Sequence, residues 1–215
     1  MTRTFVAIEL GDEARTELAR ALARLARALP GVRWVDAASI HLTLAFLGEL
    51  EDERLAAAGV AAEEAAQSVR PFGLRIAGLG TFGAPAAPRV VWAGVGGDVP
   101  RLLRLRAALA DALAARGFPR EARPFAPHLT LARLRDRLDA AELGRLVSMI
   151  EGHGAGSRSQ PVDRLDARLP VEYLSVMESE LARPAARYTC LRAISLGARP
   201  ASEGDGEGDV NVASG

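Results

Sequence analysis

Two of the three histidines in this chain begin the same five-residue string. The string His-Leu-Thr-Leu-Ala occupies residues 41–45 and occurs again at residues 128–132. Successive side chains of a β-strand point to opposite faces, so the spacing places His41, Thr43 and Ala45 together on one face. The leucines of the string then share the opposite face and anchor the strand in a core. The repeat therefore predicts two strands that each present an imidazole and a hydroxyl.

Two such strands facing each other would bring the side chains of His41, Thr43, His128 and Thr130 to one small anionic group. An unperturbed histidine has a pKa of about 6.5, so near neutral pH one imidazole can act as a base and another as an acid. Threonine hydroxyls can donate hydrogen bonds to phosphate oxygens, and an arginine can offset charge in the transition state. Arg133, where the second strand should end, is the local candidate for that arginine. The pattern predicts a phosphate site and general acid–base chemistry on a phosphodiester.

Other chemistries find little support in the sequence. All 27 basic residues counted as Lys+Arg are arginines, which excludes a lysyl-nucleotide intermediate and a P-loop lysine. The single cysteine, Cys190, and the lack of HxH, HExxH and CxxC spacings predict that no metal is bound. The G-x-S-x-G pattern of a serine nucleophile is absent. His153 lies in a glycine-rich stretch and is interpreted as a solvated surface residue.

The composition is that of a soluble globular protein. The 215 residues are 49% hydrophobic and carry a formal net charge of zero, so attraction to a polyanion has to be local. No apolar run approaches the roughly 20 residues of a membrane span, and the first residues do not resemble a signal peptide. We therefore expect a cytoplasmic protein without a membrane partner.

Helical and strand patterns alternate through two similar halves, at about 3–95 and 98–196. Helical spacing of apolar residues predicts four helices, at 12–29, 51–69, 99–116 and 138–150. Strand patterns include both motif strands and the segments 3–10, 32–35, 72–82, 89–95, 169–181 and 188–196. Frequent hairpin signals favour antiparallel α+β lobes over a doubly wound sheet. Residues 198–215 are acidic and rich in Gly and Ser, which predicts disorder.

With these motifs the sequence resembles the two-histidine (2H) phosphoesterase superfamily, and within it the RNA 2′,3′-cyclic phosphodiesterases, also called 2′-5′ RNA ligases. The resemblance spans about residues 3–196. It rests on five segments: RTFVAIEL at the start, HLTLAFLG at 41–48, RVVWAGV at 89–95, RPFAPHLTLAR at 123–133 and RYTCL at 187–191.

The resemblance implies one bilobal α+β domain over residues 1–197, with pseudo-two-fold symmetry and a V-shaped cleft between two antiparallel-sheet lobes. Strands may be exchanged between these lobes, and helices cover their outer sides. The implied reaction is hydrolysis of an RNA 2′,3′-cyclic phosphate end to a 2′-phosphate, without metal, ATP or another cofactor. A monomer acting on RNA, including tRNA fragments, is expected.

The resemblance also assigns roles by position. His41 and His128 become the catalytic pair, with His41 favoured as the acid. Thr43, Thr130 and Arg133 become phosphate ligands. The aromatic residue after the first motif is Phe46, which would contact a nucleotide base. Strict strand alternation puts Phe46 on the leucine face, so this role requires the strand to end or twist there.

Three other functions stay open at this point. One is a phosphodiesterase for small cyclic nucleotides or 2′-5′ oligonucleotides. Another is a ligase that forms 2′-5′ bonds without ATP, by reversing the hydrolysis. The third is a non-catalytic nucleotide-binding module on the same fold. Intact histidines and threonines in both motifs argue against the binding module.

Overall fold

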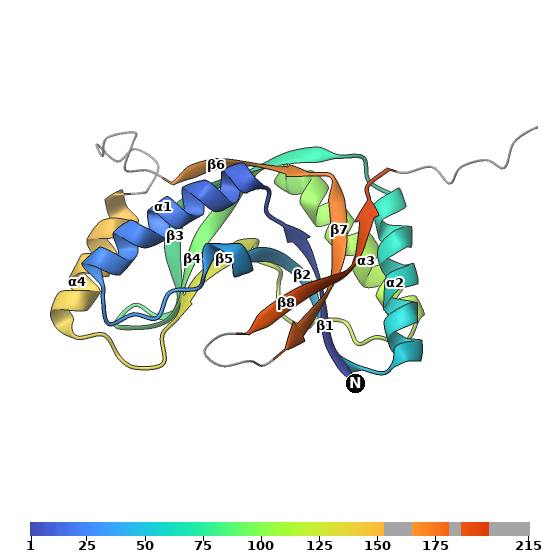
Figure 1. The fold of residues 1–215 in the computed structure, drawn as a ribbon, viewed down its shortest axis with the longest axis horizontal. Coiled ribbons are helices and arrows are strands. Elements are labelled where there is room, and N and C mark those ends of the chain that lie inside the picture. The colour runs from blue at the N-terminus through green and yellow to red at the C-terminus, as the bar shows by residue number, and fades with distance from the viewer. Residues whose placement is uncertain (153–164, 181–185, 198–215) are drawn as a thin grey trace, which may run out of the picture.

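The computed structural model describes residues 1–152, 165–180 and 186–197 (Figure 1). The predicted disordered segment 198–215 and His153 lie outside these residues. The described part contains eight strands, four α-helices and one 3-10 helix. The strands are β1 (Thr2–Glu9), β2 (His41–Leu50), β3 (Phe72–Ala84), β4 (Ala87–Gly97), β5 (His128–Arg133), β6 (Asp166–Val171), β7 (Tyr173–Glu180) and β8 (Arg187–Ser195). The helices are α1 (Asp12–Ala28), η1 (Ala37–Ser39), α2 (Asp52–Gln67), α3 (Val99–Ala115) and α4 (Ala140–Gly152).

The strands form two antiparallel sheets of four. Sheet A has the order β2-β1-β7-β8, and sheet B has the order β5-β4-β3-β6. Each sheet takes two neighbouring strands from the first half of the sequence and two from the second half. The two lobes therefore exchange strands, and the boundary between the sequence halves is not the boundary between the sheets. The antiparallel α+β architecture predicted from the sequence is confirmed.

The helices lie on the outer sides of the sheets. Helices α2 and α3 pack together beside sheet A, whereas α1 and α4 lie beside sheet B (Figure 1). One large hydrophobic core contains buried residues of both sheets and of α1, α2 and α3. The leucines of both motif strands belong to this core, and they are Leu42, Leu44, Leu129 and Leu131. The two lobes are thus held together by a common core.

Two segments differ from the sequence prediction. Residues 169–181 were predicted as one strand, but the chain forms β6 and β7, which are separated at Glu172 and belong to different sheets. Strand propensity alone cannot show that a chain changes sheets, because it does not identify the pairing partner. Residues 32–35 form no strand; Trp34 makes only an isolated antiparallel bridge with Ala132.

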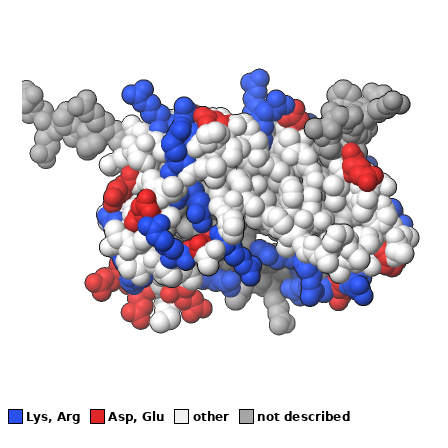
Figure 2. Space-filling view, turned by 180° about the vertical axis from the view of Figure 1, so that it is seen from behind, with Lys and Arg blue, Asp and Glu red and all other residues white. Residues whose placement is uncertain are grey.

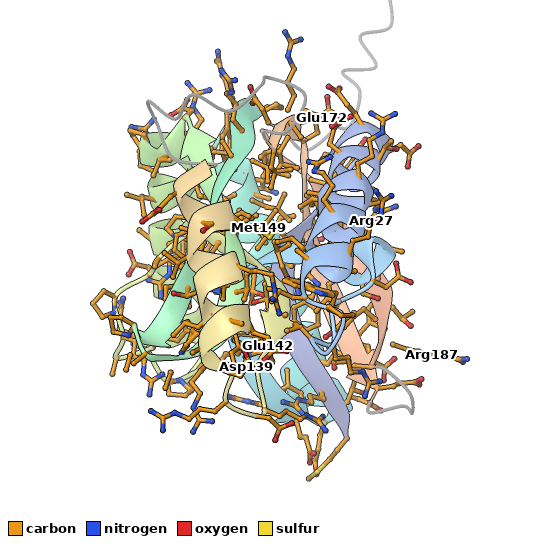
Figure 3. The ribbon with its side chains drawn as sticks, turned by 90° about the vertical axis from the view of Figure 1, so that its left-hand side faces the viewer. Arg27, Asp139, Glu142, Met149, Glu172 and Arg187 are labelled. Atoms are coloured by element: carbon orange, nitrogen blue, oxygen red, sulfur yellow. The ribbon has the colours of Figure 1, made fainter. Side chains whose placement is uncertain are left out.

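The start of α4 is fixed by a reciprocal pair of hydrogen bonds. The backbone N–H of Glu142 donates to Asp139 Oδ1 at 2.7 Å, and the N–H of Asp139 donates to Glu142 Oε2 at 2.9 Å (Figure 3). This capping box satisfies two N–H groups that a helix N-terminus leaves without partners.

Charges of both signs are distributed over the surface. On the face seen in Figure 2, arginine and acidic side chains surround a broad area without charge. No helix in the described ranges is long and apolar enough to cross a membrane.

Truncation of a motif leucine tests the common core. Leu42 and Leu129 are fully buried, so we expect Leu42→Ala or Leu129→Ala to lower the free energy of unfolding by about 2–5 kcal/mol. Leu103→Ala, on the exposed side of α3, should change it by less than about 0.5 kcal/mol. Urea titration followed by circular dichroism should show one cooperative transition for each protein. Two separate transitions would contradict a common core.

Candidate active site

The two motif strands meet because each forms the edge of its own sheet. β2 is the first strand of sheet A, β5 is the first strand of sheet B, and the two strands contact each other (Figure 1). The backbone N–H of Val35, a few residues before β2, donates to Leu131 O at 2.8 Å. On the other side, the N–H of Phe46 donates to Glu121 Oε1 at 3.3 Å, shortly before β5 begins. The segment that leads into each motif therefore contacts the motif strand of the other sheet.

Both motif histidines are held in the same way. Nδ1 of His41 lies 3.1 Å from the carbonyl oxygen of Ser39, and Nδ1 of His128 lies 2.7 Å from that of Ala126. A carbonyl oxygen can only accept, so Nδ1 carries the proton in both rings. In the neutral imidazole, Nε2 is then the nitrogen that accepts a proton. Two identical proton acceptors result, one on each motif strand.

His41 is enclosed by aromatic rings of sheet A. Its ring stacks on Phe5 at a centroid distance of 4.6 Å and meets the edge of Tyr188 at 4.9 Å. Burial lowers the pKa of His41, while the hydrogen bond to the Ser39 carbonyl and the charge of Glu9 oppose this effect more weakly. Residue spacing did not assign these rings to the site, because Phe5 and Tyr188 come from the two ends of the chain.

His128 has a different aromatic neighbour. The ring of Phe82, on β3, meets it edge-on at 4.8 Å and lies 5.4 Å from the ring of Trp92. Trp92 pairs with Thr130 and extends over Gly80, where any side chain would collide with the indole. Phe82 is another site residue that the sequence analysis missed.

Each motif strand contains a bulge after its threonine. In β2, Thr43 pairs with Ala7 but Ala45 pairs with Val6, so β2 has one extra residue. Ala45 therefore packs against the core and does not share the face of His41, contrary to the prediction. In β5 the same shift occurs between Thr130 and Ala132, which is fully buried. A bulge adds one residue to one strand and reverses the alternation beyond it.

The bulges bring two further predicted residues to the histidine face. Phe46 pairs with Phe5, its ring lies 6.1 Å from that ring, and it is 61% exposed. The strict alternation that assigned Phe46 to the leucine face was therefore wrong. Arg133 pairs with Val90 of β4, and Thr130 and His128 pair with residues on the same face of β4 as Val90. Arg133 therefore lies on the histidine face, where it is exposed. Both residues follow the bulge in their motif strand.

Among the residues that the structure describes, no group of three or more His, Cys, Asp or Glu side chains could hold a metal ion. Cys190 is exposed on β8, but partial burial of its thiol group raises its pKa. The polar groups on residues 41–45 and 128–133 of the two motif strands are two imidazoles, two threonine hydroxyls and the Arg133 guanidinium group.

The fold and these residues define a class: an α+β protein in which two sheets each bring one H-x-T-x strand to a common edge. Residues 11–181 match the 2′-5′ RNA ligase superfamily, and the chain belongs to this family. An RNA 2′,3′-cyclic phosphodiesterase of Geobacillus stearothermophilus is 40% identical over 129 residues, which are 60% of this chain but only 41% of that protein. The protein of the same name from Thermus thermophilus is 30% identical over 95% of this chain and 97% of its own length.

A solved structure supports the same relationship. The crystal structure of E. coli LigT complexed with 3′-AMP is similar with a TM-score of 0.64 and 28% identity. The similarity covers 91% of this chain and 98% of that chain. The family resemblance predicted from the two motifs is thus confirmed.

The pKa of His41 can be measured directly. Because burial has the largest effect, we expect its imidazole to titrate below the ordinary value of 6.5. The unfolded chain then binds this proton at a higher pH than the folded chain does. The folded state should therefore lose stability as the pH falls from about 6.5 through the lower pKa of the folded state. NMR titration of the ring protons, assigned with His41→Asn, provides the measurement. A midpoint at or above 6.5 would contradict the effect of burial.

Proposed function

We propose that this protein hydrolyses the 2′,3′-cyclic phosphate at the end of an RNA to a 2′-phosphate, without metal ion or ATP. The observation that carries this proposal is the matched pair of histidines, each with Nδ1–H bound to a carbonyl and Nε2 left for proton transfer. The relatives from Geobacillus and Thermus are named as RNA 2′,3′-cyclic phosphodiesterases, which supports the choice of substrate.

In the proposed reaction, neutral His128 removes a proton from a water molecule through Nε2. The water oxygen forms a bond to phosphorus, and the bond from phosphorus to the 3′-oxygen breaks. Protonated His41 gives its Nε2 proton to the departing 3′-oxygen, so the phosphate stays on the 2′-oxygen. Burial lowers the pKa of His41, which makes its imidazolium a better proton donor. The next turnover requires His128 to lose a proton and His41 to gain one.

The remaining residues of the site would hold the phosphate. Thr43 and Thr130 lie two residues after the histidines, and their hydroxyls would donate to the non-bridging oxygens. Arg133 would offset the negative charge of the transition state with its planar, permanently charged guanidinium group. Phe46, exposed on the same side as His41, offers an aromatic face to a base of the RNA chain.

The family name supports 2′-5′ ligation as a second activity. If an RNA 5′-hydroxyl took the place of water, His128 would remove its proton, the 5′-oxygen would bond to phosphorus, and His41 would protonate the departing 3′-oxygen, which gives a 2′-5′ linkage. We also propose that the protein acts as a cytoplasmic monomer, because the paired motifs are provided by one chain.

Histidine variants test the proposed reaction. In the presence of EDTA, we expect the wild-type protein to convert a short RNA with a 2′,3′-cyclic phosphate into a product with a 2′-phosphate. His41→Ala and His128→Ala should each lower turnover by about 10²–10⁴-fold, because each removes one proton-transfer group. His153→Ala is the matched control and should keep wild-type activity. Loss of activity with EDTA, or variants as active as the wild type, would refute the mechanism.

Arginine variants test the binding of phosphate. We expect Arg133→Ala to lower kcat/KM on a cyclic mononucleotide by about 10–10³-fold, because the transition state loses a positive charge. Arg133→Lys should restore only part of this loss, since the bidentate geometry is missing. Arg135→Ala, also exposed and two residues further along, serves as the control. Equal effects of Arg133→Ala and Arg135→Ala would argue against a specific role.

A further inference from the structure

A carboxylate lies beside the proposed phosphate site, where negative charge is unfavourable unless it has a use. Glu9 on β1 pairs directly with His41 on β2, so both side chains project from the same face of sheet A. Ser175 on β7 donates its hydroxyl hydrogen to Glu9 Oε2 at 2.8 Å. Cys190 on β8 lies close enough for the charge of Glu9 to contribute to its raised pKa. A carboxylate has about four lone-pair positions, so it can accept further hydrogen bonds from a ligand.

In the second lobe the equivalent position carries no side chain. The residue that pairs with His128 is Gly94, and a Cβ atom there would lie 2.6 Å from the carbonyl oxygen of Ala77. No side chain fits at that position without movement of the backbone. The two lobes are otherwise similar around their histidines, so Glu9 makes the site asymmetric. A nucleotide is also asymmetric, because its base lies to one side of its phosphate. A phosphate between the two histidines could therefore place the base on the side of Glu9.

A pocket opens next to this carboxylate. It has a volume of about 360 Å³, within the range of small-molecule sites, and Glu9, Ser175, Tyr173, Pro170 and Ala193 are among its lining residues. Tyr173 is 52% exposed and offers a flat ring at the pocket. Glu172, labelled in Figure 3, also lines the pocket where β6 ends and β7 begins. The pocket is thus bordered by apolar surface, one aromatic ring and two carboxylates, and none of the described residues that line it is basic.

We propose that this pocket binds the base of the terminal nucleotide, and that Glu9 selects a base with an amino group, so that cytosine is preferred over uracil. The proposal rests on the proposed function, because it requires the cyclic phosphate to lie at His41. Glu9 and His41 are neighbours across two strands, so a single nucleotide joins the two positions. Phe46 lies beyond Phe5, at the opposite end of this face from Glu9, and remains for the preceding base.

Cytosine and uracil have nearly the same shape but differ at the atom that would meet the carboxylate. The N4 amino group of cytosine donates a hydrogen bond, and carboxylates accept from this group in nucleic-acid recognition. Uracil has a carbonyl oxygen at that position, which would face Glu9 with two acceptors and no proton between them. A lost hydrogen bond to a charged group corresponds to a change of about tenfold or more in kcat/KM.

The experiment compares dinucleotides that end in a 2′,3′-cyclic phosphate. The terminal base is cytosine or uracil, the preceding base is held constant, and kcat/KM is measured for the wild type, Glu9→Gln and Glu13→Gln. We expect the wild type and Glu13→Gln, an exposed control on α1, to prefer the cytosine end by about tenfold or more. Glu9→Gln should remove this preference, because the glutamine amide can donate to the uracil oxygen as well as accept from the cytosine amino group.

The possible results are distinguishable. Equal rates on both ends with the wild type, or the same preference in Glu9→Gln, would overturn the proposed role of Glu9. If the cytosine preference appears instead when the terminal base is held constant and the preceding base is varied, the pocket holds the preceding nucleotide and the proposal is overturned. If Glu9→Gln lowers both rates equally and shifts the pH profile of kcat/KM, Glu9 acts only through the charge of His41 and the base pocket is refuted. Failure to hydrolyse any of the dinucleotides would instead count against the proposed function itself.

Discussion

The packing of four leucines behind the two motif strands is the constraint on which the site depends. Leu42 and Leu44 on β2 and Leu129 and Leu131 on β5 are buried in one core that spans both sheets. Alternation along the strands then forces the histidines and threonines to the opposite face. The segments that lead into the motifs also cover part of the two sheet edges, because the N–H of Val35 donates to Leu131 O and the N–H of Phe46 donates to Glu121 Oε1. The contact between β2 and β5 thus joins the lobes and brings the two motifs together.

The chain connects the two sheets at two places. Sheet A contains β7 and β8 from the end of the chain, and sheet B contains β3 and β4 from its first half. The chain crosses between the sheets after α2 and again at Glu172, where β6 is followed by β7. Sheet A therefore combines strands from both ends of the chain, whereas the strands of sheet B follow one another from β3 to β6. Sheet A cannot be removed as one continuous segment.

The two lobes repeat the same local geometry around their histidines, which explains why Nε2 is the proton acceptor in both. The side chains around the two histidines differ, and this difference could distinguish the two ends of a substrate. Both histidines have the same hydrogen bond from Nδ1 to a carbonyl two residues earlier. Their surroundings differ, because His41 contacts Phe5 and Tyr188 whereas His128 contacts Phe82. The local backbone geometry is repeated in both lobes, and the side chains from neighbouring strands are not. The burial that lowers the pKa of His41 follows from its neighbours on sheet A.

The sequence by itself determined the two motif strands, the four helices, the antiparallel α+β class and the family. These features depend on local alternation, helical spacing and motif identity, which can be recognised within short segments of the chain. Only the tertiary structure decided that residues 169–181 are divided between two sheets. It also placed Phe46 on the histidine face, because the extra residue of a bulge appears only when a strand is paired with its neighbour. Glu9 is an ordinary strand residue in the sequence, and only its pairing with His41 gives it a place in the site.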